Sequence, residues 1–263
     1  MQHLHALWRA RGFIAGSVLR EFSGRYRSSL LGAGWAIITP LAMVLVYLLV
    51  FSQVMQARLP GRAGAMDYGV YLCAGVLVWG FFAEILNRST TMFLDSAGLL
   101  KKMNFPRVCL PVIVVVNASM NFAIVFLLFL ALLALTGHFP GRYVLALPPL
   151  MLLLGVLACS LGTVMGMINV FFRDVGQALG VILQVWFWMT PIVYPVSILP
   201  HAIEPVVLAN PVTPVVSAVQ RVALGTGWPQ WEQLLVPTAA TLLVAAFAFG
   251  LFRRHAHEIV DEL

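Results

Sequence analysis

Charged residues are scarce in this 263-residue chain. Asp, Glu, Lys and Arg make up 10% of it, whereas 61% of the residues are hydrophobic and the mean hydropathy is +0.93. A soluble domain carries about 25% charged residues, because its surface must stay hydrated. The composition therefore excludes a soluble enzyme, a disordered regulator and a secreted disulfide scaffold, and it predicts a protein that lies in a lipid bilayer.

Motifs for cofactors and catalysis are also missing. The three cysteines, Cys73, Cys109 and Cys159, lie in apolar stretches with neither disulfide nor metal-site spacing. The sequence has no G-x-x-x-x-G-K-[ST] loop for nucleotide phosphates, no H-E-x-x-H and no C-x-x-C. We therefore expect no cofactor and no enzymatic activity in this chain, so any uphill transport needs energy from another chain.

The net charge of +6 does not indicate a nucleic-acid partner. Basic residues are scattered between apolar runs and form no block longer than the pairs 101–102 and 253–254. A basic excess of this kind is typical of the cytosolic loops of membrane proteins. We expect membrane lipids, and no nucleic acid, as partners.

Six long uncharged runs predict six transmembrane helices, since a helix needs about 20 apolar residues to cross a bilayer. The runs cover residues 28–57, 68–83, 108–141, 143–172, 175–203 and 233–252. The second is the shortest, and it extends toward residue 91 only if Glu84 and Arg88, spaced i,i+4, pair with each other. The predicted fold class is an all-α integral membrane protein with a transmembrane domain at 28–252.

The basic residues also predict the orientation. With the N-terminus in the cytosol, the inner segments 1–27, 88–107, 173–174 and 253–263 hold twelve lysines and arginines, and the outer segments hold four. Cytosolic loops carry the excess of Lys and Arg. Both termini are therefore predicted to be cytosolic, with residues 253–263 as a short tail.

Residues 1–27 are predicted to form an amphipathic helix at the cytosolic membrane surface. Apolar residues recur there at helical spacing beside five arginines, and no apolar core of the length of a signal peptide is present. The alternative is a plain cytosolic lead-in.

Proline is concentrated before the last predicted span. Eight of the fifteen prolines lie within residues 191–237, and the apolar pieces between them are too short to cross a membrane. We expect residues 196–230 to form re-entrant helices on the outer side, where broken backbone is tolerated if it packs in protein or lines a cavity. The alternative is an ordinary outer loop.

Several blocks, in order along the chain, carry a family resemblance. They are residues 25–35 (RYRSSLLGAGW) with 39–41 (TPL), residues 99–107 (LLKKMNFPR) with 110–111, residues 169–175 (NVFFRDV), 191–195 (PIVYP) and 210–211 (NP). With them the chain resembles the membrane subunits of bacterial polysaccharide-exporting ABC transporters, the type-two exporter permeases of O-antigen, capsule and teichoic acid export.

This resemblance implies a half-size permease of the bacterial inner membrane. It implies a homodimer that binds two ATP-binding-cassette subunits, with ATP and Mg on those partners, and a lipid-linked polysaccharide as substrate. It also implies that residues 92–107 form a cytosolic coupling helix. The coupling residues would be Leu99, Leu100, Lys101, Lys102 and Phe105. The alternative is a cytosolic loop with positive-inside lysines.

Two further sets of residues are candidates for contact with such a substrate. Its phosphate would meet arginines at the cytosolic face, which are equally suited to anchoring lipid headgroups: Arg25, Arg27, Arg88 and Arg107. Sugar rings stack on aromatic walls, although aromatic side chains are also common in membrane spans. The candidates to line the conduit are Trp35, Trp79, Phe82, Trp186, Trp188 and Tyr194.

Other functions stay open at the level of the sequence. A permease of the same architecture could export a drug or a lipid. An ion-coupled carrier or a membrane scaffold belongs to a different class, and Glu84 is the one ionisable residue near a span that such a carrier could use.

Overall fold

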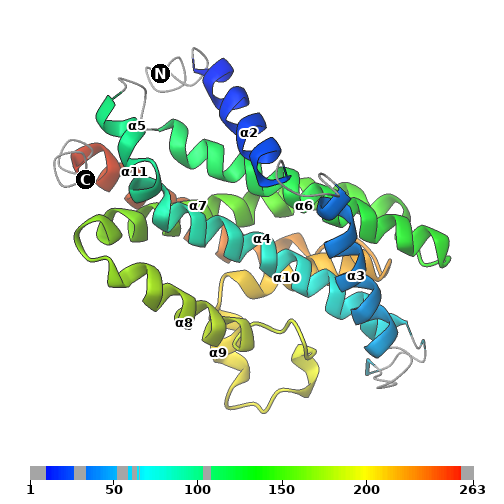
Figure 1. Cartoon of the computed structure of the whole chain (residues 1–263). Helices are drawn as coiled ribbons and strands as arrows, with labels where there is room; N and C mark the ends of the chain where they lie inside the picture. Colours follow the sequence, from blue (N-terminus) through cyan, green and yellow to red (C-terminus); the bar gives the residue numbers. More distant parts are fainter. Residues whose placement is uncertain are drawn as a thin grey trace.

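The computed structural model describes residues 10–26, 34–51, 59–60, 64, 66–102 and 108–255, and within them it contains helices and turns but no strand (Figure 1). The all-α class is confirmed for this part of the chain. The α-helices are α2 (Arg11–Tyr26), α3 (Trp35–Leu49), α4 (Asp67–Asp95), α5 (Ala97–Lys102), α6 (Cys109–Leu135), α7 (Leu147–Phe171), α8 (Asp174–Trp188), α9 (Glu204–Ala209), α10 (Val212–Ala223) and α11 (Leu235–His255). Short 3₁₀ helices lie at Gly141–Ala146, Val196–Ile198 and Trp231–Leu234.

Four helices in the described part of the chain are long and apolar enough to cross a membrane. They are α4, α6, α7 with its preceding turn, and α11 with its preceding turn. They fall on the second, third, fourth and sixth predicted spans. Helix α3 has 15 residues, about 22 Å at 1.5 Å per residue, which is shorter than the hydrocarbon core of about 30 Å.

The fifth predicted span, located in the uncharged run 175–203, is not confirmed as a full crossing. Helix α8 also has 15 residues and ends at Trp188. The chain then turns, and buried Thr190 and Ile192 pack into the protein. Within this run residues 190–192 are buried in protein, whereas most of α8 and residues 201–203 are exposed, so the absence of charge did not mark a single crossing.

The predicted coupling helix over 92–107 is likewise divided. Helix α4 continues to Asp95, the chain bends at Ser96, and the six residues of α5 follow. Residues 103–107 lie outside the described residues.

Helix α4 is the centre of the fold. It packs against α3, α6, α7, α8 and α10, and most of its residues are buried. Its closest neighbour is α7, where Gly162 and Gly166 face the α4 backbone: a Cβ at Gly162 would lie 2.9 Å from the Leu86 oxygen, and one at Gly166 2.6 Å from the Ser89 oxygen. Small residues four apart allow two membrane helices to approach closely.

The outer helices present apolar side chains outward instead. Large hydrophobic residues are exposed along α3, α8 and α11, for example Val181, Val185, Leu242 and Phe247. Water-soluble monomers do not expose contiguous apolar surface on this scale. The protein is therefore an integral membrane protein whose outward surface is fitted to lipid.

Connections between helices gather at two opposite ends of the bundle. Helix α5, the turn between α7 and α8, and the end of α11 lie together on one side of the view, and the turn after α6 lies at the other (Figure 1). The first end is joined by stacking of Phe93 on Phe252. At the second end, Tyr143 meets Trp228 edge-on. We call these the Phe93 end and the Tyr143 end.

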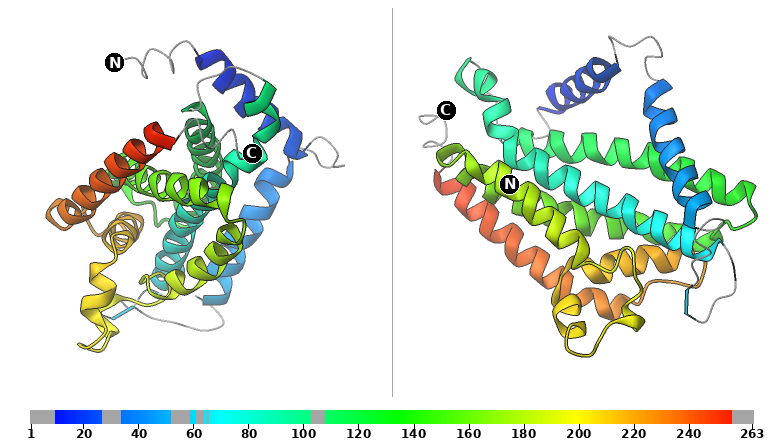
Figure 2. Two further views of the ribbon diagram at one scale, coloured as in Figure 1. Left: turned by 90° about the vertical axis from the view of Figure 1, so that its left-hand side faces the viewer. Right: turned by 60° about the horizontal axis from the view of Figure 1, so that its bottom comes forward.

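The proline-rich region contains short helices, as the sequence predicts. Helix α9 has six residues and α10 has twelve. Most residues of α10 are buried, and the helix packs against α4 and α7 toward the Tyr143 end (Figure 2). Its backbone is thus covered by protein, which is the condition under which a re-entrant helix is tolerated in a membrane.

Candidate functional site

Five polar side chains from three helices form a cluster in this otherwise apolar protein. Its centre is Arg88 on α4, which forms ion pairs with Glu21 on α2 and, at 3.6 Å, with Glu84 one turn earlier on α4. The pairing of Glu84 with Arg88 predicted from the sequence is confirmed. The pairing with Glu21 was missed, because no sequence pattern links residues 67 positions apart.

Two asparagines of α6 complete this polar cluster. Asn117 donates from Nδ2 to Glu21 Oε2 at 2.5 Å, and Asn121 donates from Nδ2 to Glu84 Oε2 at 2.9 Å. The spacing of four places both amides on one face of α6. Each carboxylate is therefore held by the arginine and by an amide, and the cluster fastens α2 to α4 and α6.

The polar cluster bears on the prediction that Arg88 contacts the substrate phosphate. Its side chain is 25% exposed and already engages two carboxylates. A substrate phosphate would therefore compete with Glu21 and Glu84 for this guanidinium group. Of the other three candidates, Arg25 lies on α2 without a described side-chain position, and Arg27 and Arg107 lie outside the described residues. Phosphate contact by these arginines stays a prediction.

A groove of about 410 Å³ begins at the polar cluster, between α3, α4 and α6. Glu84 and Asn121 line one end of it together with Trp35, whose side chain is 43% exposed. Among the predicted conduit aromatics, Trp35 is thus the one that borders this groove.

The other conduit aromatics divide between core and surface. Trp79 and Phe82 are buried in the main hydrophobic core, and the ring of Trp186 lies 6.3 Å from that of Trp79 and 5.2 Å from that of Phe82. Trp188 is 60% exposed, and the hydroxyl of half-buried Tyr194 donates to its carbonyl at 2.6 Å. Within one chain, therefore, only Trp188 and Trp35 offer large exposed ring surfaces among these six.

The turn after α8 is held by polar contacts from α4 and α10. The Tyr71 hydroxyl donates to the Pro191 carbonyl at 2.9 Å, and Gln220 donates from Nε2 to the same oxygen at 3.2 Å. One turn earlier on α4, the Tyr68 hydroxyl donates to the Val193 carbonyl at 2.6 Å. The PIVYP block thus makes a fixed turn, which gives it a structural role that the sequence alone did not reveal.

The second block of this region, Asn210–Pro211, connects the turn to the aromatic core. Asn210 accepts from the Trp186 indole N–H at 3.0 Å and donates to the Thr190 hydroxyl at 2.9 Å. Its Oδ1 also accepts from the backbone N–H of Val212, the first residue of α10, at 3.0 Å. Asn210 therefore ties the start of α10 to the end of α8.

The NVFFRDV block fixes the turn between α7 and α8 through one buried asparagine. Asn169 donates from Nδ2 to the Thr90 carbonyl of α4 at 3.1 Å and accepts from the Gly176 backbone N–H of α8 at 3.0 Å. That N–H belongs to the first turn of α8 and has no partner within its own helix. The side chain thus holds α7, α4 and α8 together at the Phe93 end.

We expect Asn169→Leu to destabilise this turn. The substitution keeps the volume but leaves the Thr90 carbonyl and the Gly176 N–H without this partner, at a cost of about 1–3 kcal/mol for each buried group. Thermal unfolding of the purified variant in detergent measures the loss. Asn87→Leu, a neighbouring surface asparagine on α4 that is exposed, is the matched control, and equal stability of the two variants would contradict the assignment.

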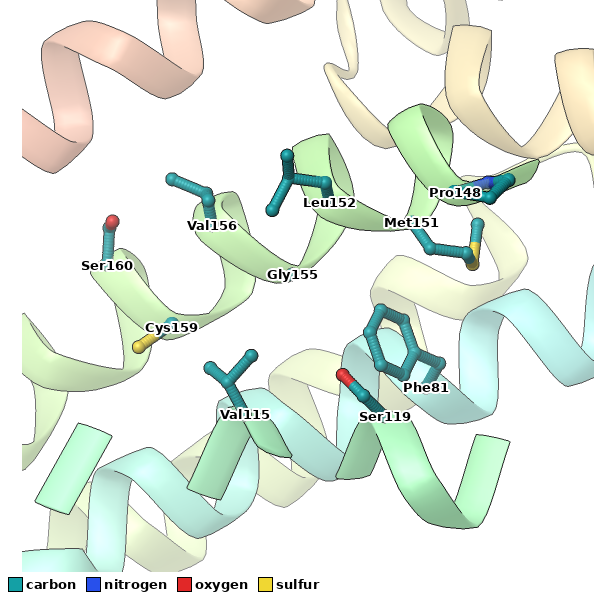
Figure 3. Close-up of a pocket in the computed structure, with 10 residues that line it drawn as sticks. All are labelled: Phe81, Val115, Ser119, Pro148, Met151, Leu152, Gly155, Val156, Cys159 and Ser160. Carbon is teal, nitrogen blue, oxygen red and sulfur yellow. The ribbon is translucent and has the colours of Figure 1, made fainter. Parts of the chain in front are cut away.

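A second groove, of about 370 Å³, lies between α6 and α7 over Phe81 of α4 (Figure 3). Its oxygen-bearing side chains are those of Ser119 and Ser160, and the remainder of its lining is apolar apart from the Cys159 thiol. None of the residues predicted for the transport path lines it.

The predicted coupling residues are only partly described. Lys101 is exposed on α5, whereas Leu100 is buried in a small core at the Phe93 end with Phe93 and Phe252. The side chains of Leu99 and Lys102 are not described, and Phe105 lies outside the described residues. Leu100 therefore anchors α5 to the bundle, and Lys101 is available to a partner.

Within the described ranges, His, Cys, Asp and Glu side chains form no group of three that could hold a metal ion. The absence of a cofactor in this chain stays a prediction.

A family model described as ABC-2 type transporter matches residues 15–224, which is most of the chain. The chain belongs to the ABC-2 type transporter membrane family. The matched region runs from α2 to the end of α10 and so includes the polar cluster, the groove beside it and the turn after α8. The family assignment from the sequence motifs is confirmed.

Curated relatives match nearly the full chain. The O-antigen export system permease protein RfbA of Myxococcus xanthus is 29% identical over 98% of this chain and 97% of its own length. A protein of the same name from Klebsiella pneumoniae is 25% identical over 93% of this chain and 92% of its own. The polysialic acid transport protein KpsM of Escherichia coli is 26% identical over 89% of this chain and 90% of its own.

Proposed function

We propose that this chain is the permease half of an ATP-driven exporter that moves a lipid-linked, O-antigen-like polysaccharide from the cytosolic to the outer side of the bacterial inner membrane. The observation that carries the proposal is the similarity to the RfbA permease of Myxococcus xanthus along almost the whole of both chains. The energy source would be a separate ATP-binding-cassette subunit, since this sequence has no phosphate-binding loop.

The Phe93 end is proposed to face the cytosol. Lys101 on α5, Arg173 at the turn between α7 and α8, and Arg253 and Arg254 at the end of α11 lie there. Lysine and arginine are enriched in the cytosolic loops of membrane proteins. In that orientation the four long helices cross the membrane, α3 and α8, with 15 residues each, take the places of the first and fifth spans without reaching the length of a full crossing, and α10 is a re-entrant helix on the outer side.

Transport by the reconstituted complex tests the proposal. The chain, co-purified with its ATP-binding-cassette subunit, is placed in proteoliposomes with a lipid-linked O-antigen glycan. We expect ATP-dependent transfer of the glycan across the membrane, and no transfer with the chain alone or with an ATPase that cannot hydrolyse ATP. Transfer by the chain alone would refute the proposal.

A capsule-type polysaccharide is the second candidate substrate, and the similarity to KpsM is the observation that favours it. Offering an acidic capsule glycan beside the O-antigen glycan in the same assay separates the two. The higher ATP-dependent rate identifies the substrate class.

Coupling through α5 predicts the effect of charge reversal at its lysines. We expect Lys101→Glu with Lys102→Glu to weaken ATPase binding or glycan-stimulated ATP hydrolysis by about tenfold, because two attractive contacts become repulsive. Arg253→Glu with Arg254→Glu, at the end of α11, is the control for a general loss of positive charge. Normal ATPase binding and export in the lysine variant would remove the coupling role of α5.

Phosphate reception predicts a different result for Arg25, near the end of α2, and Arg27. We expect Arg25→Ala with Arg27→Ala to reduce export by about tenfold while ATPase binding is unchanged, because charge-assisted contacts to the substrate phosphate are lost. Co-purification with the ATPase and the transport assay measure the two properties separately. Unchanged export, or loss of both properties together, would contradict this role.

A further inference from the structure

The groove between α3, α4 and α6 opens on the lipid-facing surface. Its α3 wall contains Met43, which is exposed, and the neighbouring α3 residues Ile38 and Val46 are exposed apolar side chains as well. Its floor on α4 includes Gly80, where an added Cβ would meet no atom within 4 Å. The groove is therefore continuous with the surface that contacts the bilayer.

The lining changes from polar to apolar along the groove. Thr39, Glu84 and Asn121 lie toward the polar cluster that fastens α2, together with the indole of Trp35. Farther along the helices the lining is apolar. This second part consists of Met43, Val76, Leu77, Phe122 and Val125. A molecule in the groove would thus have a polar group near α2 and a hydrocarbon chain that extends away from it.

The chemistry of the polar end selects a neutral polar group. Among the described residues that line the groove none is basic, and the acidic one, Glu84, accepts a hydrogen bond from Asn121 and pairs with Arg88. Thr39 and Trp35 offer a hydroxyl and an indole N–H, which suit an ester carbonyl. A phosphate at this position would lie beside a carboxylate without a lining cation, so the phosphate-bearing end of a transported glycolipid does not fit.

We propose that this groove is a binding site for one acyl chain of a bilayer glycerolipid, with the ester group near Trp35 and Thr39 and the chain along Gly80 toward Val76. The bound lipid fills the space between α3 and the α4–α6 pair, which the protein side chains leave open. The proposal requires that the protein lies in a membrane, and it does not depend on which substrate is exported.

Retention of lipid by the purified full-length chain tests the site. The chain is extracted from vesicles of phosphatidylethanolamine and phosphatidylglycerol and examined by native mass spectrometry in detergent without added ATP. We expect one retained diacyl lipid per chain. Gly80→Leu should lower the retained fraction by about tenfold. The Leu side chain would take the space of about two methylene groups of the lipid chain, and their burial in the groove would be lost.

Gly250→Leu is the matched control, since Gly250 is an exposed helical glycine of α11 where an added Cβ also meets no atom within 4 Å. Met43→Trp, which fills the groove from α3, is the second variant in case Gly80→Leu does not fold, and thermal unfolding reports folding for each. Retention that is equal in the groove variants and in Gly250→Leu would refute the site. Preferential retention of an added isoprenoid phosphate over the diacyl lipids would refute the acyl-chain assignment, and neither result depends on export.

Discussion

Gly162→Ala is expected to separate α7 from α4 and to leave little folded, export-competent protein. The new Cβ would lie 2.5 Å from the Ser89 Cβ and 2.9 Å from the Leu86 carbonyl oxygen. Overpacking of a well-packed interface costs about 1–3 kcal/mol, and more where backbone must move. The yield of monodisperse protein and its thermal unfolding in detergent measure the effect.

A second substitution tests whether the new methyl group between α7 and α4 clashes with a side chain or with the backbone. Ser89→Gly removes the Cβ that the new methyl group meets first, so Gly162→Ala with Ser89→Gly should recover part of the stability. Gly166→Ala should not be rescued in this way, because its Cβ would meet the Ser89 carbonyl oxygen at 2.6 Å. Equal rescue of both variants, or stability of Gly162→Ala equal to that of the Gly250→Ala control, would contradict the close crossing.

Arg88→Met is the other substitution with a large expected effect. It leaves Glu21 and Glu84 without the cation that both of them pair with in the structure. Removing one partner of a fully buried pair costs about 3–5 kcal/mol, and we expect about 2–3 kcal/mol here because these side chains are between 22% and 37% exposed and are partly screened. Thermal unfolding of the variant measures the loss.

The combination of Arg88→Met with Glu21→Gln and Glu84→Gln separates the structural role of Arg88 from phosphate contact. Neutralising both carboxylates should restore most of the stability, since neither side chain then carries the charge that paired with Arg88. If export returns with the stability, Arg88 acts by fastening α2 to α4 and α6. A stable variant without export would instead assign Arg88 to substrate phosphate and would contradict the purely structural role.

Uncharged runs in the sequence located helices better than they located membrane crossings. The run at 108–141 became the 27-residue α6, because nothing within it stops a helix that is solvated by lipid. The run at 175–203 became α8, which is largely exposed, and a turn that is buried at residues 190–192, because burial in protein removes charge as effectively as burial in lipid does. Composition alone cannot distinguish these two surroundings.

The second predicted span differs from its expectation in another way: its charged residues suggested a marginal span, but its helix lies at the centre of the protein. Glu84 and Arg88 made its uncharged run the shortest of the six, yet α4 is the most buried of the long helices in the described part of the chain. Its Arg88 pairs with Glu21 of α2, and its Glu84 accepts a hydrogen bond from Asn121 of α6. The sequence revealed the i,i+4 pair, since that contact is local, whereas Glu21 and the two asparagines required the tertiary structure.

The sequence by itself determined that this protein lies in a membrane, that it is helical, where four of its long helices are and to which transporter family it belongs. These properties follow from composition, from runs of about 20 residues and from short motifs, all of which are local. Only the tertiary structure decided that α4 is central, that Trp79 and Phe82 are buried, and that α2 is fastened by Arg88. Those properties depend on contacts between residues far apart in the chain. Hydrophobicity is the strongest signal of this sequence, and it is the same for a side chain that faces lipid and for one that faces another helix.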